Sequence, residues 1–132
     1  MAAIHRPAHL THHAAKIASA ACLEKSKAIG VPMNVAIVDA SLYLLHFERM
    51  PGAKLTSVDI SMNKAFTAAG HHAPTSVYKE AVWPGGAAFG LNNSNGGKFI
   101  TGTPAQDTEV AQAGVDAVLS YIKKNSQLKA KL

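Results

Sequence analysis

The chain is poor in cysteine, aromatic residues and charge. Cys22 is its only cysteine among 132 residues, so no disulfide can form within the chain and cysteines cannot build a zinc site. Aromatic residues make up 6% of the sequence and charged residues 16%, whereas hydrophobic residues, many of them alanine, reach 48%. We therefore expect a single domain over residues 1–132 with a closely packed, helix-rich core. Its thinly charged surface favours self-association.

Signals for membranes and for nucleic acids are also absent. Residues 1–13 lack the apolar core of a signal peptide, and no run approaches the about 20 apolar residues that a membrane-spanning helix needs. The net charge is +5, but the basic residues are not interleaved with aromatic ones and no nucleic-acid motif is present. We expect a cytoplasmic protein that binds neither membranes nor nucleic acid. A small anionic ligand is compatible with the charge.

Hydrophobic periodicity and capping residues predict the order helix, strand, strand, helix, short helix, strand, helix. The two strands that follow the first helix are joined by a tight turn, which predicts a hairpin. The class is therefore α+β, with an antiparallel sheet flanked by helices. The predicted elements are a helix capped by Thr11 and ending near residue 29, strands at 34–39 and 43–49, a helix that Ser57 caps and Gly70 ends, a short helix after Thr75, a strand near 98–101 and a helix that begins after Thr103.

Glycine is concentrated in residues 82–97, which hold five of the chain's ten glycines. Neither a helix nor a central strand tolerates that density, because glycine costs backbone entropy and offers no side chain to pack. The segment is either a long surface loop or a loop that contacts a ligand.

Several segments, in the same order over nearly the whole chain, resemble the haem-degrading GlcG/HbpS-like family. This family also supplies the C-terminal domain of PduO-type proteins. The resemblance implies an antiparallel sheet between helices and assembly into dimers or larger homo-oligomers. In some members it also implies binding of haem or of a corrinoid-related partner. The matching segments are 10–11, 30–39 (GVPMNVAIVD), 47–50 (FERM), 57–60, 64–68 (KAFTA), 74–75, 84–86, 90–91, 95–97 (NGG) and 102–107 (GTPAQD).

Two departures from the family pattern stand out. Family members usually carry a strand, a turn and a further strand between the Asn-Gly-Gly loop and the last helix, whereas residues 97–102 pass almost directly across. About 20 residues, the length of a two-stranded hairpin, are absent. We expect a shortened sheet whose open edge a partner chain covers. In addition, Ser41-Leu42 stands where the family usually has Gly-Gly, so this turn must be made differently.

Histidine is abundant, with seven residues, and three of them lie within residues 9–13. Imidazoles at the start of a helix can hold a metal, and one can be an axial ligand of haem. The resemblance to PduO-type proteins favours haem, with His13 as the candidate ligand and His12 as a second metal-ligand candidate. The alternative is a solvated helix start. We expect His46 on the exposed face of its strand and His71-His72 as a cap or an interface.

A second candidate site combines positive charge with the glycine-rich loop. Arg49, Lys64 and the backbone amides of Asn95-Gly96-Gly97 can hold a carboxylate or a haem propionate. The alternative is that either cation forms an ion pair with a nearby carboxylate. The carboxylates considered are Asp39, Asp59 and Glu80.

These residues leave two functions open. The first is a small-ligand or haem-binding domain that acts as a homo-oligomer, with haem as the candidate cofactor. The second is an enzyme on the same scaffold that acts on a small anionic or aromatic substrate. Glu80 would then be the catalytic acid–base group, and Trp83 would line a pocket beside the glycine-rich loop.

Overall fold

The computed structural model describes residues 8–78, 80–81, 84–87 and 105–129. These residues confirm the predicted α+β class and the order of its helices and hairpin strands. The predicted strand near 98–101 lies outside the described residues, as do Trp83 and Asn95-Gly96-Gly97. The elements are α1 (His12–Ala28), β1 (Asn34–Val38), β2 (Leu44–Arg49), α2 (Ser57–His71), the 3-10 helix η1 (Thr75–Tyr78) and α3 (Ala105–Lys129).

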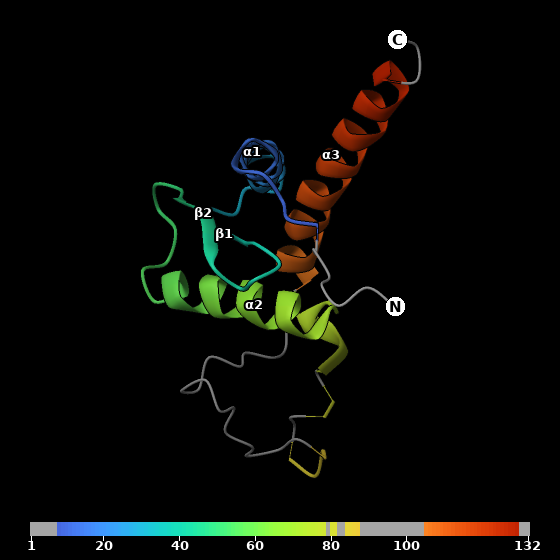
Figure 1. Ribbon diagram of the computed structural model, residues 1–132. Helices are drawn as coiled ribbons and strands as arrows, with labels where there is room; N and C mark the ends of the chain where they lie inside the picture. The colour runs from blue at the N-terminus through green and yellow to red at the C-terminus, as the bar shows by residue number, and fades with distance from the viewer. Residues whose placement is uncertain (1–7, 79, 82–83, 88–104, 130–132) are drawn as a thin grey trace, which may run out of the picture.

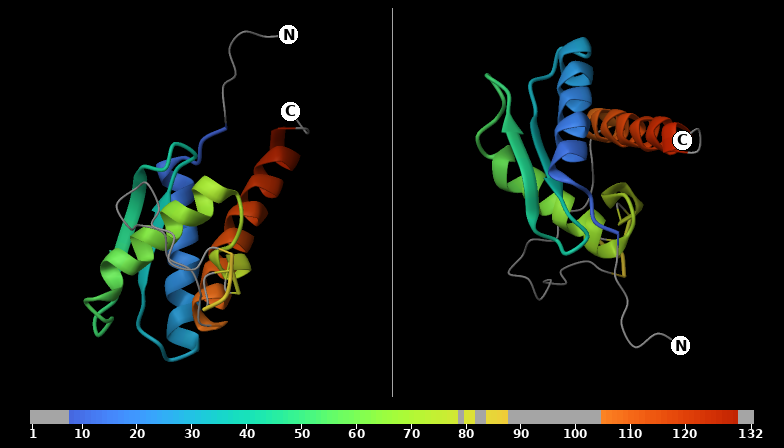
Figure 2. Two further views of the ribbon diagram at one scale, coloured as in Figure 1. Left: turned by 90° about the horizontal axis from the view of Figure 1, so that it is seen from below. Right: turned by 45° about the horizontal axis from the view of Figure 1, so that its top comes forward.

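The hairpin of β1 and β2 lies between two layers of helix (Figure 1). Helix α1 covers one face of the hairpin and α2 covers the other. Helix α3 packs along α1, and only its C-terminal end extends away from the other elements (Figure 2). Within the described ranges, no helix has both the length and the apolar character that crossing a membrane requires.

The face of α1 that packs inward is made of small residues. Thr11 caps the helix as predicted, because its Oγ1 accepts a hydrogen bond of 3.1 Å from the backbone N–H of Ala14. Small side chains allow the neighbouring backbones to approach closely, so the core is thin and alanine-rich. The buried residues of α1 are Ala14, Ala15, Ala18, Ser19, Cys22 and Ser26. The cluster at the centre of the core joins Cys22 of α1 to Val35 of β1 and Val110 of α3.

The turn between β1 and β2 contains no glycine and is stabilised by the side chain of Asp39. The Oδ1 of Asp39 accepts backbone hydrogen bonds from Ser41 at 2.8 Å and from Tyr43 at 3.1 Å. Leu42 adopts the left-handed conformation with φ of 70°, a position at which glycine avoids a cost of about 1 kcal/mol. The expectation that this turn differs from a Gly-Gly turn is confirmed.

Helix α2 begins and ends one or two residues away from the predicted limits. Thr56, rather than Ser57, is the N-cap residue, and its side chain makes no capping hydrogen bond. The helix passes through Gly70, which was wrongly predicted to end it, and His72 takes the left-handed C-cap conformation with φ of 53°. The left-handed residue that ends the helix is His72 and not Gly70, so Gly70 keeps the helical conformation. The role of His72 as a cap is confirmed.

Candidate functional site

Two neighbouring histidines at the start of α1 reach toward different parts of the fold. The ring of His12 lies 6.0 Å, centroid to centroid, from the ring of His46 on β2. The ring of His13 meets Tyr121 of α3 edge-on at 5.4 Å. Both His12 and His13 are exposed. The first turn of α1 therefore offers two accessible imidazoles, one beside the hairpin and one beside α3.

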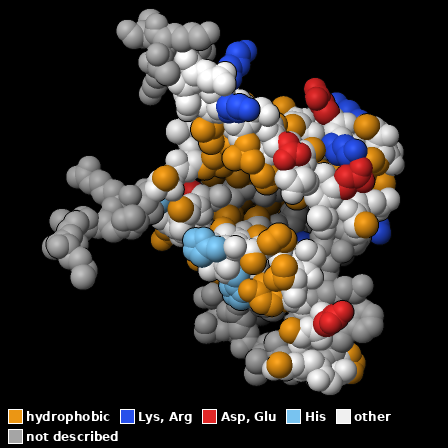
Figure 3. Space-filling view, turned by 90° about the vertical axis from the view of Figure 1, so that its right-hand side faces the viewer, with side chains coloured by type: hydrophobic (Ala, Val, Ile, Leu, Met, Phe, Trp, Pro, Cys, Tyr) orange, Lys and Arg blue, Asp and Glu red, His pale blue; other side chains and the backbone are white. Residues whose placement is uncertain are grey.

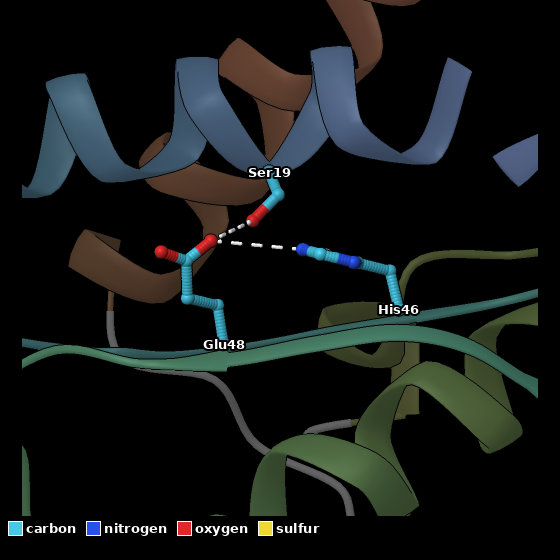
Figure 4. A network of polar contacts seen from close by, with 3 residues as sticks. All are labelled: Ser19, His46 and Glu48. Carbon is cyan, nitrogen blue, oxygen red and sulfur yellow. Dashed lines mark hydrogen bonds and ion pairs between the residues drawn. The ribbon is translucent and has the colours of Figure 1, made fainter. Parts of the chain in front are cut away.

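His46 faces α1, which corrects the prediction of an exposed position. Its side chain is 20% exposed, and its Nε2 lies 3.6 Å from the Oε2 of Glu48 (Figure 4). In the hairpin register His46 pairs with Ile37, and Glu48 pairs with Val35 of the core. Cross-strand pairs share a face of the sheet, so both polar side chains lie on the α1 side. The small residues of α1 leave room for them beneath the helix.

Ser19 completes this group from the helix above. Its Oγ donates a hydrogen bond of 3.0 Å to the same Oε2 of Glu48 that faces His46 (Figure 4). Ser19 is only 1% exposed. A serine nucleophile is accessible and is activated by a neighbouring base, whereas this hydroxyl is buried and bonded to a carboxylate. The group therefore fixes the Glu48 carboxylate beside His46 and does not form a hydrolytic site.

The described residues contain no closed metal centre. Nowhere in these ranges do three or more histidine, cysteine, aspartate or glutamate side chains gather closely enough to hold a metal ion together. Cys22 is buried and free, and burial raises the pKa of its thiol. Its Sγ donates a hydrogen bond to the backbone carbonyl of Val110 at 3.2 Å, which suits a structural role.

The two cations of the second candidate site make different contacts. The Nζ of Lys64 lies 2.7 Å from the Oδ2 of Asp107 at the start of α3, and the Lys64 side chain is 16% exposed. The sequence pointed to other carboxylates as partners, because local patterns do not show that the start of α3 lies near Lys64 of α2. Arg49 is exposed and ends β2 opposite Asn34. Glu80 is exposed in a turn.

Helix α3 carries an exposed apolar stripe that was not predicted from the sequence. Val110 and Gly114 lie on the inward side of α3, and both are buried. The exposed stripe, Val115, Leu119 and Ile122, is at least half exposed, and its spacing of four and three residues places it on one side of the helix. Figure 3 shows hydrophobic side chains on either side of a hollow on one face of the molecule, with histidines beside it.

Comparison with known protein families shows the family to which this chain belongs. Residues 10–103 match the family model described as haem degrading protein HbpS-like. The chain belongs to this family. The match ends two residues before α3 begins, yet α3 contributes Val110 to the core of this HbpS-like domain.

Curated relatives include proteins of corrinoid metabolism. The HbpS-like domain is 29% identical to the corrinoid adenosyltransferase PduO of Salmonella typhimurium over 133 residues, which cover 85% of this chain and 40% of the relative. It is 37% identical to an uncharacterized 15.0 kDa protein of Citrobacter freundii over 70% of this chain and 66% of the relative. The chain thus spans less than half of PduO. Because the first alignment is longer than this 132-residue chain, PduO carries residues without a counterpart here, as a shortened domain requires.

Solved structures show the same fold. Klebsiella pneumoniae protein ORFY superposes with a TM-score of 0.82 at 27% identity, covering 89% of this chain and 96% of that one. A structure described as a PduOC:heme complex superposes with a TM-score of 0.75 at 29% identity, covering 82% of this chain and 94% of the other. A structural relative of this HbpS-like domain has therefore been seen with haem.

Proposed function

We propose that this HbpS-like domain binds haem and that His13 supplies an axial ligand to its iron. The observation that carries the proposal is the superposition on a relative described as a haem complex, at 29% identity over 82% of this chain. The family model, which describes haem-degrading proteins, points to the same cofactor.

The residues at the start of α1 have the chemistry that haem requires. Neutral imidazole is a common axial ligand of haem iron, and the exposed ring of His13 is braced by Tyr121. Bound haem would supply the redox chemistry of its iron, while the protein supplies ligation and burial.

The propionates of haem are the anionic part of this ligand, and Arg49 is the better of the two predicted cations to receive one. Lys64 is already paired with Asp107 at 2.7 Å, whereas Arg49 is exposed at the end of β2. An arginine can bind a carboxylate with two parallel hydrogen bonds. The glycine-rich loop, including Asn95-Gly96-Gly97, remains a proposed part of the same ligand site.

We also propose that the domain acts as a homo-oligomer. The exposed stripe of Val115, Leu119 and Ile122 supports this proposal, because it leaves apolar surface that a second copy can cover. Light scattering at micromolar concentration should give a multiple of 13.8 kDa. A mass near 13.8 kDa would contradict the proposal.

Haem binding is tested by titrating purified protein with haemin, followed by gel filtration. We expect a Soret band that travels with the protein, and His13→Ala should shift that band and weaken binding at least tenfold. His72→Asn serves as the matched control, because it removes an imidazole elsewhere and asparagine tolerates the left-handed conformation of this cap. Protein that remains colourless would contradict the proposal and favour the acid–base enzyme with Glu80.

A further inference from the structure

The geometry points to a second ligand site: we propose that His12 and His46 together bind a divalent transition-metal ion, with water completing its coordination. The two imidazoles come from different elements, the first turn of α1 and strand β2, and meet at one edge of the α1–hairpin interface. This site is separate from the proposed haem ligand, because His13 faces α3 instead.

The separation of the rings suits one shared ion. A metal–nitrogen bond of about 2.1 Å plus about 1.1 Å from nitrogen to ring centre places the metal about 3.2 Å from each centroid. Two imidazoles on one ion therefore have centroids at most about 6.4 Å apart, and about 5.2 Å at a tetrahedral angle. The observed 6.0 Å, with the rings tilted by 52°, lies within this range. His12 is exposed, so rotation of its side chain can close the remaining distance.

Glu48, held by Ser19, lies where the carboxylate that orients a ligating histidine usually stands. Histidines that bind metals usually donate their other ring N–H to a carboxylate or carbonyl group, which fixes the tautomer. The Oε2 of Glu48 lies 3.6 Å from the Nε2 of His46 and accepts a hydrogen bond from the buried Ser19. A proton held on Nε2 leaves the lone pair of Nδ1 for the metal. Figure 4 shows this order, with Glu48 at the Nε2 tip of the ring.

The donor set selects the class of metal ion. Imidazole nitrogen suits Cu²⁺, Ni²⁺ and Zn²⁺, whereas Mg²⁺ and Ca²⁺ prefer oxygen ligands. Two protein ligands leave several positions to water, which distinguishes this site from a closed structural centre with three or four side chains. Affinity should follow the usual order for nitrogen sites, so that Cu²⁺ binds more tightly than Ni²⁺ or Zn²⁺.

The test is a titration of tag-free, haem-free protein with Ni²⁺ by calorimetry and with Cu²⁺ by electron paramagnetic resonance. We expect one ion per chain and hyperfine coupling from two nitrogens. His12→Ala and His46→Gln should each weaken binding at least tenfold. The double variant should lose little beyond either single change, because both remove ligands of the same ion. Glu48→Gln should weaken binding by about tenfold or more, as loss of a supporting carboxylate does.

Two controls separate this site from a folding defect and from the haem site. His12 is exposed, so His12→Ala tests metal binding even if His46→Gln disturbs the packing beneath α1, which a lower midpoint of thermal unfolding would reveal. His13→Ala should weaken haem binding and leave Ni²⁺ binding unchanged, whereas His46→Gln should do the reverse. Ni²⁺ binding that survives His12→Ala, or that is lost equally in His72→Asn, would overturn the proposal.

Discussion

Gly114 of α3 lies directly against Cys22 of α1, so that a Cβ on Gly114 would stand 2.6 Å from the Cys22 Sγ. The same Cβ would lie 3.2 Å from the carbonyl oxygen of Ala18. The two helices therefore approach at a point where α3 has no side chain. Because the Cys22 Sγ also donates a hydrogen bond to Val110 one turn away, the thiol cannot move aside without losing that contact.

Gly114→Ala should lower the free energy of unfolding by about 1–2 kcal/mol. Overpacking of a tight core costs about 1–3 kcal/mol, and the better helix propensity of alanine recovers about 1 kcal/mol at most. Urea denaturation measures the change. In a Cys22→Ala background the closest contact is gone, so Gly114→Ala should cost at least about 0.5 kcal/mol less. Equal costs in both backgrounds would show that the thiol does not limit the approach of the helices.

Thr11→Ala should destabilise the protein by about 1 kcal/mol, because it removes the hydrogen bond from the Thr11 side chain to the N–H of Ala14. Thr56→Ala is the matched control. Thr56 is the N-cap of α2 but makes no side-chain capping bond, so its loss should cost clearly less. Thermal melts of the two variants, recorded side by side, check the difference. A larger effect at Thr56 would reverse the assignment of the caps.

Gly70→Ala should stabilise the protein by about 0.5–1 kcal/mol. The position is helical, and an added Cβ would meet the Leu42 side chain at 3.6 Å, an ordinary contact distance. If Gly70 instead ended the helix in the left-handed conformation, alanine would destabilise the protein by a similar amount. The sign of the change in denaturation midpoint therefore distinguishes the two arrangements.

Asp107→Asn should cost more than Glu109→Gln, although both remove a carboxylate from the first turns of α3. Asp107 pairs with Lys64, whose side chain is 16% exposed, whereas Glu109 pairs with the 36%-exposed Lys25. An ammonium left without its partner in a half-buried site costs about 1–3 kcal/mol, and an exposed pair contributes less than about 1 kcal/mol. Chemical denaturation in low and high salt measures both losses.

Local sequence predicted the parts of the fold that depend on neighbouring residues. Thr11 caps α1 because its hydroxyl is three residues from the N–H that it binds. The apolar run of residues 35–38 in β1, followed by Asp39, likewise predicted a strand and a turn. These sequence signals act between near neighbours. They predicted the turn correctly even though Leu42 stands where the family usually has glycine.

The orientation of His46 depends on an arrangement that local sequence does not contain. Alternation along a strand identifies the inward face only when one face is solvated, and here helices cover both faces of the hairpin. The partner of Lys64 was missed for a related reason, since Asp107 is 43 residues away along the chain. Local sequence therefore singled out Lys64 but did not identify the carboxylate that it contacts.

The hydrogen bond between Cys22 and Val110 joins residues 88 positions apart, and it bears on the order in which the protein is made. During synthesis α1 and the hairpin leave the ribosome well before α3 exists. The side of α1 at Cys22 that α3 covers thus stays exposed until α3 emerges. Long-range contacts of this kind form late and slow the folding of a domain. In a nascent chain that stalls before Val110, Cys22 and Val35 would lack the α3 residue that packs against them in the folded protein.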